Sequence, residues 1–272
     1  MNSFNLTRDN FKSRIAQSFS RAAKGYDQEA SLQKQVANQL LEFLPKQLSS
    51  NPSDTVILDL GTGTGYAIPY LTQLYPDAHL LGVDVAEGML KVNASQNGHL
   101  LIDYICADAE SLPFVDASVD LIVSSLAIQW CRDYPAFFAE CKRVLKPQGQ
   151  LYISTLGPRS LWQLHEAWLK VDEIQHVNRF EALETLVSYS DGLTLFLKET
   201  EVNKQAYPNL QQLLKSLKSI GASVVEHRET TGLGGRHRLA QLEKVYQSFV
   251  HGDGSLPLTY QVFYLAWCKN DR

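Results

Sequence analysis

Short apolar runs alternate with helix-like stretches through the middle of the chain. Five runs rich in Val, Ile and Leu are bounded by Gly, Pro and Asp, and segments with helical spacing separate them. These runs occupy residues 55–60, 79–85, 100–108, 119–126 and 150–156. Continuous apolar runs are typical of strands buried on both faces, and helices between them imply right-handed crossovers between parallel strands. The pattern therefore predicts an α/β fold with a doubly wound, mostly parallel sheet.

The flanks of this region add two strands and several helices. An alternating stretch at 193–206 and a β-rich segment at 259–267 predict a sixth and a seventh strand. Apolar positions with helical spacing predict two amphipathic helices within the first 46 residues, separated by a break at 24–27 that contains a glycine. We therefore expect a seven-stranded sheet covered by helices.

No internal repeat, low-complexity tract or linker divides the sequence. This favours a single domain over residues 1–272. Within it, we expect the N-terminal helices of residues 1–46 and an insertion at 157–190 to form an α-helical cap over the site. Such a cap would exclude water during a reaction.

The composition is that of a globular protein. Apolar residues make up 44% of the chain and charged residues 20%, so a sizeable core can form and disorder of the whole chain is excluded. The formal net charge of -4 disfavours nucleic acid as a partner. No run approaches the ~20 apolar residues that span a bilayer, and the N-terminus lacks an apolar signal core. We expect a soluble, cytoplasmic protein that binds no membrane.

A glycine-rich loop follows the first predicted strand. In Asp59–Gly65, which reads DLGTGTG, glycines at alternate positions permit positive φ angles and let a ligand lie against the backbone. The helix that follows offers free N–H groups at its N-terminus. Packing alone is the alternative role of such a turn. The dinucleotide-binding fingerprint needs glycine at position 66, where Tyr66 stands, so a nicotinamide cofactor is disfavoured.

Acidic residues lie at the ends of the second and third predicted strands. Asp84 is placed to accept two hydrogen bonds from a ribose diol, or to cap the helix that begins near Ala86. Asp108 is expected to face an adenine amino group, with the backbone N–H of Ala109 available to a ring nitrogen. Met89 would pack on the adenine face or simply belong to the core.

Four segments of the middle region resemble the successive motifs of class I S-adenosylmethionine-dependent methyltransferases. They are DLGTGTG, Asp84, DAESLPF and VDLIVSSLAIQW, and they lie in the family's order over residues 54–156. The resemblance implies S-adenosyl-L-methionine as cofactor, with the methionine moiety on the glycine loop, the ribose on Asp84 and the adenine on Asp108. The candidate cofactor-binding residues are Asp59, Gly61, Gly63, Gly65, Asp84, Met89, Asp108, Ala109 and Ser125.

The flanking segments resemble a narrower family, the malonyl-acyl carrier protein O-methyltransferases of biotin synthesis. The resemblance rests on IAQSFSRAAKGYDQEASLQKQVANQLLEFL, SSLAIQWC, HVNRF, GLGGRHRL and PLTYQVFYL. It implies methylation of the free carboxylate of a malonyl group that phosphopantetheine attaches to an acyl carrier protein. The alternatives are methyl transfer to another small carboxylate or to a hydroxyl, and a non-catalytic module that binds S-adenosylmethionine.

The implied chemistry needs few protein groups. A carboxylate has an unperturbed pKa of about 4 and is ionised at neutral pH, so its attack on a sulfonium methyl needs no general base. No His/Cys cluster has zinc spacing, so no metal is expected.

Two residues are candidates for placing the substrate. Tyr26 is expected to close over the sulfonium and donate a hydrogen bond to the carboxylate, or to plug the junction between two helices. Arg179 is expected to pair with the malonyl carboxylate, or to form a salt bridge with Glu181 or Glu184.

Basic residues are concentrated at the two flanks. Residues 1–46 carry a net charge of +3 and residues 204–238 a net charge of +4, whereas residues 47–203 carry -11. Because carrier proteins are acidic, the flanks offer a complementary docking face. The candidates are Arg14, Arg21, Lys24, Lys215, Lys218, Arg236 and Arg238, and a general solvated surface is the alternative role of each.

Overall fold

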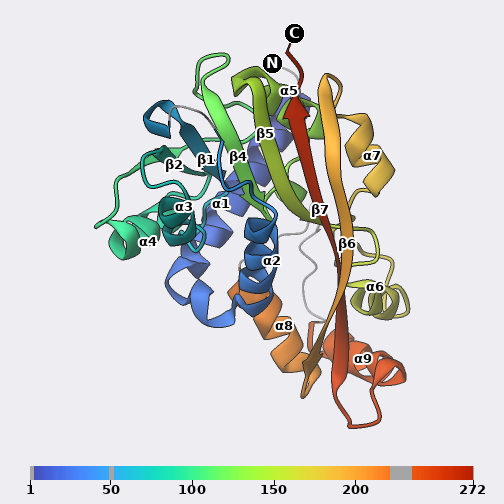
Figure 1. Cartoon of the computed structure of the whole chain (residues 1–272). Coiled ribbons are helices and arrows are strands. Elements are labelled where there is room, and N and C mark those ends of the chain that lie inside the picture. The colour runs from blue at the N-terminus through green and yellow to red at the C-terminus, as the bar shows by residue number, and fades with distance from the viewer. Residues whose placement is uncertain (1–2, 49–51, 221–234, 272) are drawn as a thin grey trace.

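Seven strands form one sheet in the computed structural model, which describes residues 3–48, 52–220 and 235–271 (Figure 1). The strands are β1 (Val56–Leu60), β2 (His79–Asp84), β3 (Ile102–Cys106), β4 (Val119–Ser125), β5 (Leu145–Leu156), β6 (Leu193–Tyr207) and β7 (Leu256–Lys269). Their order across the sheet is β3-β2-β1-β4-β5-β7-β6. All seven predicted strands are therefore present.

The sheet is parallel except at β7. Parallel pairing joins β1 to β2 and β4, β2 to β3, and β4 to β5. Strand β7 runs antiparallel to both β5 and β6, and β6 and β7 together form the long arm on the right of Figure 1. The strand order reverses between β1 and β4, and this reversal opens a crevice at their carboxyl ends. The predicted doubly wound, mostly parallel sheet is confirmed.

Helices cover both faces of the sheet. They are α1 (Ser3–Glu29), α2 (Ser31–Glu42), α3 (Ile68–Leu74), α4 (Glu87–Asn97), α5 (Tyr134–Val144), α6 (Trp162–Leu169), α7 (Leu183–Ser188), α8 (Leu210–Ser219) and α9 (Gly235–Tyr246). The adjacent residues Ile57 and Leu58 of β1 belong to opposite hydrophobic clusters, because successive side chains of a strand point to opposite faces. Leu40 of α2 packs in the first cluster and Phe137 of α5 in the second.

Helix α1 is longer than the sequence predicts. It is one helix from Ser3 to Glu29, so the predicted break at 24–27 is wrong, and Tyr26 lies in the last helical turn. A glycine inside a helix costs only about 1 kcal/mol, and tertiary packing offsets that cost. Helix α1 packs against α4 so closely that a Cβ on Gly88 would lie 2.7 Å from the backbone of Ser20. The Gly88 N–H also donates to Ser20 Oγ at 3.1 Å.

The N-terminal half of α1 crosses the loops at the carboxyl ends of the strands. Phe11 and Ile15 form a small buried cluster with Val85 after β2 and Trp130 after β4. The ring of Phe19 meets Trp130 edge-on, with 5.3 Å between centroids. Apolar contacts of this kind hold the helix over the crevice.

The predicted insertion divides between two places. Val177 packs in the cluster that contains α2 and α8, whereas Leu186 of α7 packs in the cluster that contains α5. Only the part of the segment before α7 therefore lies on the same side as α2 and α8.

Candidate active site

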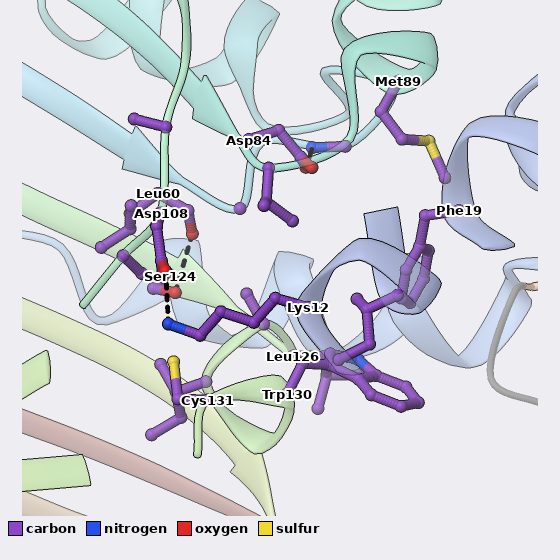
Figure 2. Close-up of a pocket in the computed structure, with 18 of the residues that line it drawn as sticks. Lys12, Phe19, Leu60, Asp84, Met89, Asp108, Ser124, Leu126, Trp130 and Cys131 are labelled. Atoms are coloured by element: carbon purple, nitrogen blue, oxygen red, sulfur yellow. Dashed lines mark hydrogen bonds and ion pairs between the residues drawn. The ribbon is translucent and has the colours of Figure 1, made fainter. Parts of the chain in front are cut away.

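A cavity lies beneath α1 at the carboxyl ends of the parallel strands (Figure 2). The loops after β1, β2, β3 and β4 form its walls, and Lys12, Ile15, Phe19 and Tyr26 line the side that α1 covers. Seven of the predicted cofactor residues line this cavity: Gly61, Gly63, Asp84, Met89, Asp108, Ala109 and Ser125. Asp59 lines an adjoining cavity. The fold thus brings together the residues that the sequence placed at the ends of four separate strands.

Two glycines of the loop have different surroundings. Gly63 has φ +54° and lines both cavities, and a Cβ built on it would meet no atom within 4 Å. Gly65 has φ +85°, and a Cβ there would lie 2.2 Å from Asn93 Oδ1 and 2.5 Å from Asn97 Nδ2 of α4. Gly63 therefore keeps the ligand side of the loop open, whereas Gly65 serves the packing of the loop on α4.

Asp84 ties the glycine loop to the start of α4. One carboxylate oxygen accepts from the Gly63 N–H at 2.9 Å and the other from the Ala86 N–H at 2.7 Å. The residue at the N-cap position of α4 is Ala86, so Asp84 is not the cap itself. Burial raises the pKa of Asp84 to about 6, although the hydrogen bonds from Ala86 and Gly63 oppose the rise. The carboxylate is ionised at neutral pH and faces the cavity as a hydrogen-bond acceptor.

Asp59 is buried behind the loop. Its carboxylate accepts a hydrogen bond from Thr62 Oγ1 at 2.6 Å, and Asn93 Nδ2 donates to the same hydroxyl at 3.0 Å. Burial raises the pKa of Asp59 to about 7; the Thr62 hydrogen bond lowers it and the charge of Asp84 raises it further. The Asp59 carboxyl group stabilises the loop through its hydrogen bond with Thr62. When it is ionised, its burial lowers the stability of the folded protein.

We expect Asp59→Asn to stabilise the protein at pH 8 by about 2 kcal/mol or more. The carboxyl binds protons more tightly in the folded chain than in the unfolded one. The contribution of Asp59 to the wild-type free energy of unfolding is therefore lost as pH rises from about 4 towards 7. An amide at this position does not titrate, so the variant lacks this dependence of stability on pH. Urea unfolding at pH 5 and pH 8 measures the effect, with the exposed Asp77→Asn as control. Equal loss of stability with pH in wild type and Asp59→Asn would refute this assignment.

Lys12 occupies the side of the cavity where the sequence places adenine. Its ammonium contacts Asp108 and lies 2.7 Å from Glu110 Oε2, and Figure 2 shows it reaching from α1 across the cavity. Burial alone would lower the pKa of Lys12, but hydrogen bonds to both acids raise it. Asp108 also accepts from the Glu110 N–H at 3.0 Å, so both of its carboxylate oxygens are engaged. An adenine amino group at Asp108 would have to share or replace the contact with Lys12.

The adjoining cavity lies between the glycine loop and α2. It is lined by Lys34 of α2 together with Asp59, Gly61 and Gly63. The Lys34 ammonium donates to the carbonyl of Asp27 at 2.8 Å. This cation is placed to meet the carboxylate of an amino-acid moiety. Neither Lys12 nor Lys34 was singled out by the sequence, because a lysine on an amphipathic helix gives no signal of what the helix covers.

A second large cavity adjoins the first. The two share Phe19, Tyr26, Leu126 and Trp130 in their walls. The second cavity is mostly apolar and is also lined by α2, α8 and residues just before α7. It is therefore placed to hold an acceptor beside a ligand bound in the first.

Tyr26 stands where the two cavities meet. It lines both of them and is partly buried. Burial and the charges of Asp84 and Asp27 raise the pKa of Tyr26, so its hydroxyl keeps its proton and remains a donor. Arg179, by contrast, is exposed, whereas its neighbours Asn178 and Phe180 line the second cavity.

Two absences within the described residues bear on the type of site. Among these residues, no group of three or more His, Cys, Asp and Glu side chains is placed to hold a metal ion. No helix in the same ranges is both long and apolar enough to cross a bilayer.

Comparison with known proteins defines the class. Residues 58–153 match the family model of the methyltransferase domain. A putative methyltransferase from Bacillus halodurans C-125 superposes with a TM-score of 0.60 over 86% of this chain and 98% of its own, at 18% identity. The strand order, the glycine loop and these matches define a class I methyltransferase fold.

Relatives over nearly the whole chain define the family. The malonyl-(acyl-carrier protein) O-methyltransferase of Gallionella capsiferriformans is 38% identical over 266 residues, which cover 94% of this chain and 90% of that protein. The biotin biosynthesis bifunctional protein BioHC of Cellvibrio japonicus is 42% identical over 261 residues, but the chain spans only about half the length of such bifunctional relatives. The chain belongs to the malonyl-acyl carrier protein O-methyltransferase family.

Proposed function

We propose that the protein transfers the methyl group of S-adenosyl-L-methionine to the free carboxylate of a malonyl thioester carried by an acyl carrier protein. The observation that carries this proposal is the pair of adjoining cavities that share Tyr26. One cavity is lined by the glycine loop and acids, and the other is mostly apolar. Membership of the family supports the choice of substrate, and methylation of a different small carboxylate or of a hydroxyl is the second candidate.

The residues of the first cavity fit the proposed cofactor. Gly63 leaves open space over the loop, and Asp84 presents an ionised acceptor for a ribose diol. Asp108 presents acceptor oxygens that adenine would share with Lys12. Lys34 and the loop would hold the amino-acid moiety. When bound, S-adenosyl-L-methionine supplies an electrophilic methyl group on a sulfonium.

The protein's part in the reaction is to position the acceptor carboxylate beside the methyl group and to exclude water from both. The acceptor carboxylate is already ionised, so no residue has to remove a proton. Because attack on a sulfonium neutralises both charges, a site that excludes water favours the transition state. Residues 1–46 and the part of 157–190 that precedes α7 would provide that exclusion as a cap, with Phe19 and Trp130 closing the boundary between the cavities. Tyr26 would donate a hydrogen bond to the carboxylate, and Arg179 remains the proposed partner for its charge.

The carrier protein would dock where α1 and α8 meet. These helices contact each other, and each lines the second cavity, through Phe19 and Tyr26 on α1 and Leu217 on α8. The exposed basic residues on their outer faces are Arg21, Lys24, Lys215 and Lys218. An acidic carrier held there would direct its phosphopantetheine arm into the second cavity. We expect the methyl transfer to take place in the cytoplasm.

Charge reversal on α8 tests the docking face. We expect Lys215→Glu with Lys218→Glu to lower kcat/KM for malonyl carrier protein about tenfold at low salt, and the difference to shrink at high salt. A malonyl thioester of N-acetylcysteamine lacks the carrier protein, so wild type and the double variant should have equal kcat/KM for it. The exposed Lys198→Glu on β6 is the matched control. Turnover of the carrier substrate that is independent of salt and of these changes would refute the docking face.

The function itself is tested with S-adenosylmethionine labelled in its methyl group. Malonyl carrier protein and the purified chain should give a labelled product that loses its label on mild base treatment, as a methyl ester does. A base-stable label on a different acceptor would point to hydroxyl methylation. No transfer to malonyl carrier protein, from a chain that binds S-adenosylhomocysteine, would overturn the proposed substrate.

A further inference from the structure

The reacting groups must meet where three cavities join. With the ribose at Asp84 and the amino-acid moiety beside Lys34, the transferable methyl group lies between the first cavity and the adjoining cavity. The second cavity, which would hold the acceptor, shares Tyr26 and Gln33 with the adjoining cavity, and Tyr26 lines all three. An acceptor carboxylate that reaches the methyl group therefore comes within range of these two side chains.

The side-chain amide of Gln33 is accessible and has no protein partner. Gln33 is half-buried in the first turn of α2, between Leu32, which lines the second cavity, and Lys34, which lines the adjoining cavity. Within the described ranges, its amide makes no hydrogen bond. It is also absent from the buried, unpaired polar atoms of the same residues, which are Asn203 Nδ2 and Trp267 Nε1. Its donors and acceptor are therefore available to a ligand.

The other amides of the second cavity wall are already engaged. Gln129 Nε2 donates to the Leu126 carbonyl, and Gln129 Oε1 accepts from Thr155 Oγ1 at 3.4 Å. Asn178 and His176 likewise have partners within the protein. Of the three side-chain amides in the described wall, only the one on α2 is without a protein partner.

We propose that Gln33 donates its amide N–H to one oxygen of the acceptor carboxylate, beside the Tyr26 hydroxyl, and so directs the second oxygen at the methyl group. This inference rests on the proposed function. A neutral donor orients the carboxylate without cancelling its negative charge, and one bound oxygen leaves the other free to attack. A bidentate guanidinium would engage both oxygens. Because the ester product is uncharged, it accepts a weaker hydrogen bond and leaves the site more readily than the substrate.

The test compares Gln33→Leu with the control Gln39→Leu. Gln39 is also half-buried on α2 but lines none of the three cavities. At saturating S-adenosylmethionine, we expect Gln33→Leu to lower kcat/KM for malonyl carrier protein at least about tenfold, and Gln39→Leu to leave it unchanged. Acetyl carrier protein lacks the carboxylate, so it should inhibit wild type and Gln33→Leu with equal affinity. Affinity for S-adenosylhomocysteine should stay within twofold of wild type.

The isosteric Gln33→Glu gives a readout that a structural role would not. It keeps the size of the side chain but replaces the amide donor with a second carboxylate beside that of the acceptor. At pH 8 we expect its kcat/KM to fall further than that of Gln33→Leu. Its ratio to wild type should rise as the pH falls towards 5, because protonation removes the repulsion and restores a donor. A ratio independent of pH would contradict the proposal.

The outcomes separate the two proposals. If wild type does not methylate malonyl carrier protein, the proposed function fails and the role of Gln33 fails with it. If wild type is active and Gln33→Leu keeps its kcat/KM within twofold, the role of Gln33 is refuted while the function stands. Weaker inhibition by acetyl carrier protein would place Gln33 on the thioester. Weaker binding of S-adenosylhomocysteine with unchanged acceptor kinetics would place it on the cofactor, and either result overturns the inference. If Gln33→Leu is unstable, Gln33→Glu must show the recovery at low pH or the inference is overturned.

Discussion

Asp84→Ala should weaken the binding of S-adenosylhomocysteine by about 100-fold. The substitution removes the ionised acceptor that faces the cavity, and a ribose diol would lose two charge-assisted hydrogen bonds. It also releases the N–H groups of Gly63 and Ala86, so the loop loses its tie to the start of α4. Isothermal titration calorimetry at pH 7.5 measures the effect.

A matched acid separates this result from a general effect of charge. Asp103 lies on β3, is exposed, and pairs with His79; neither residue lines the cavity. Asp103→Ala should bind the nucleotide as wild type does. Unchanged affinity in Asp84→Ala, in a chain that unfolds at the wild-type temperature, would remove Asp84 from the ribose site.

Alanine substitutions at two glycines of the loop should have different effects, one on nucleotide affinity and the other on stability. Gly63→Ala should keep the fold, with a cost of about 1 kcal/mol for its left-handed φ, and lower nucleotide affinity at least about tenfold because its Cβ enters space meant for the ligand. Gly65→Ala should instead lower the free energy of unfolding by about 2 to 4 kcal/mol, because its Cβ collides with buried Asn93 and Asn97. Urea unfolding and calorimetry on both variants measure the contrast.

The opposite pattern would contradict the geometry of the loop. A stable Gly65→Ala would contradict the tight packing of the loop on α4. Gly63→Ala with full affinity for S-adenosylhomocysteine would mean that the loop does not hold a ligand on the Gly63 side. Because the two positions are only two residues apart, each variant is the control of the other.

The sheet was predictable because its signal is local. Each buried parallel strand is a continuous apolar run, and the end of the run marks the edge where ligands bind, as at Asp84, the last residue of β2. The unbroken α1 was not predictable, because the glycine that indicates a break is overridden by packing of Ser20 on Gly88, 68 residues away.

The parts of the site that depend on tertiary packing were also missed. Lys12 meets Asp108 only because α1 crosses the sheet edge, a contact between residues 96 positions apart. The sequence singled out Arg179 because a guanidinium matches a carboxylate, but Arg179 is exposed, and its neighbours Asn178 and Phe180 line the second cavity instead. The orientation of the residues before α7 depends on contacts with α6 and the turn after it, where Trp168 and Asp172 hold the His176 ring.

Calorimetric titration of the purified wild-type chain with S-adenosylhomocysteine tests the central claim most directly, namely that the cavity beneath α1 is a nucleotide site. Saturable binding of one nucleotide per chain, lost in Asp84→Ala and kept in Asp103→Ala, is the result that the structure predicts. No heat of binding from a folded wild-type chain, or equal binding by all three proteins, would contradict it.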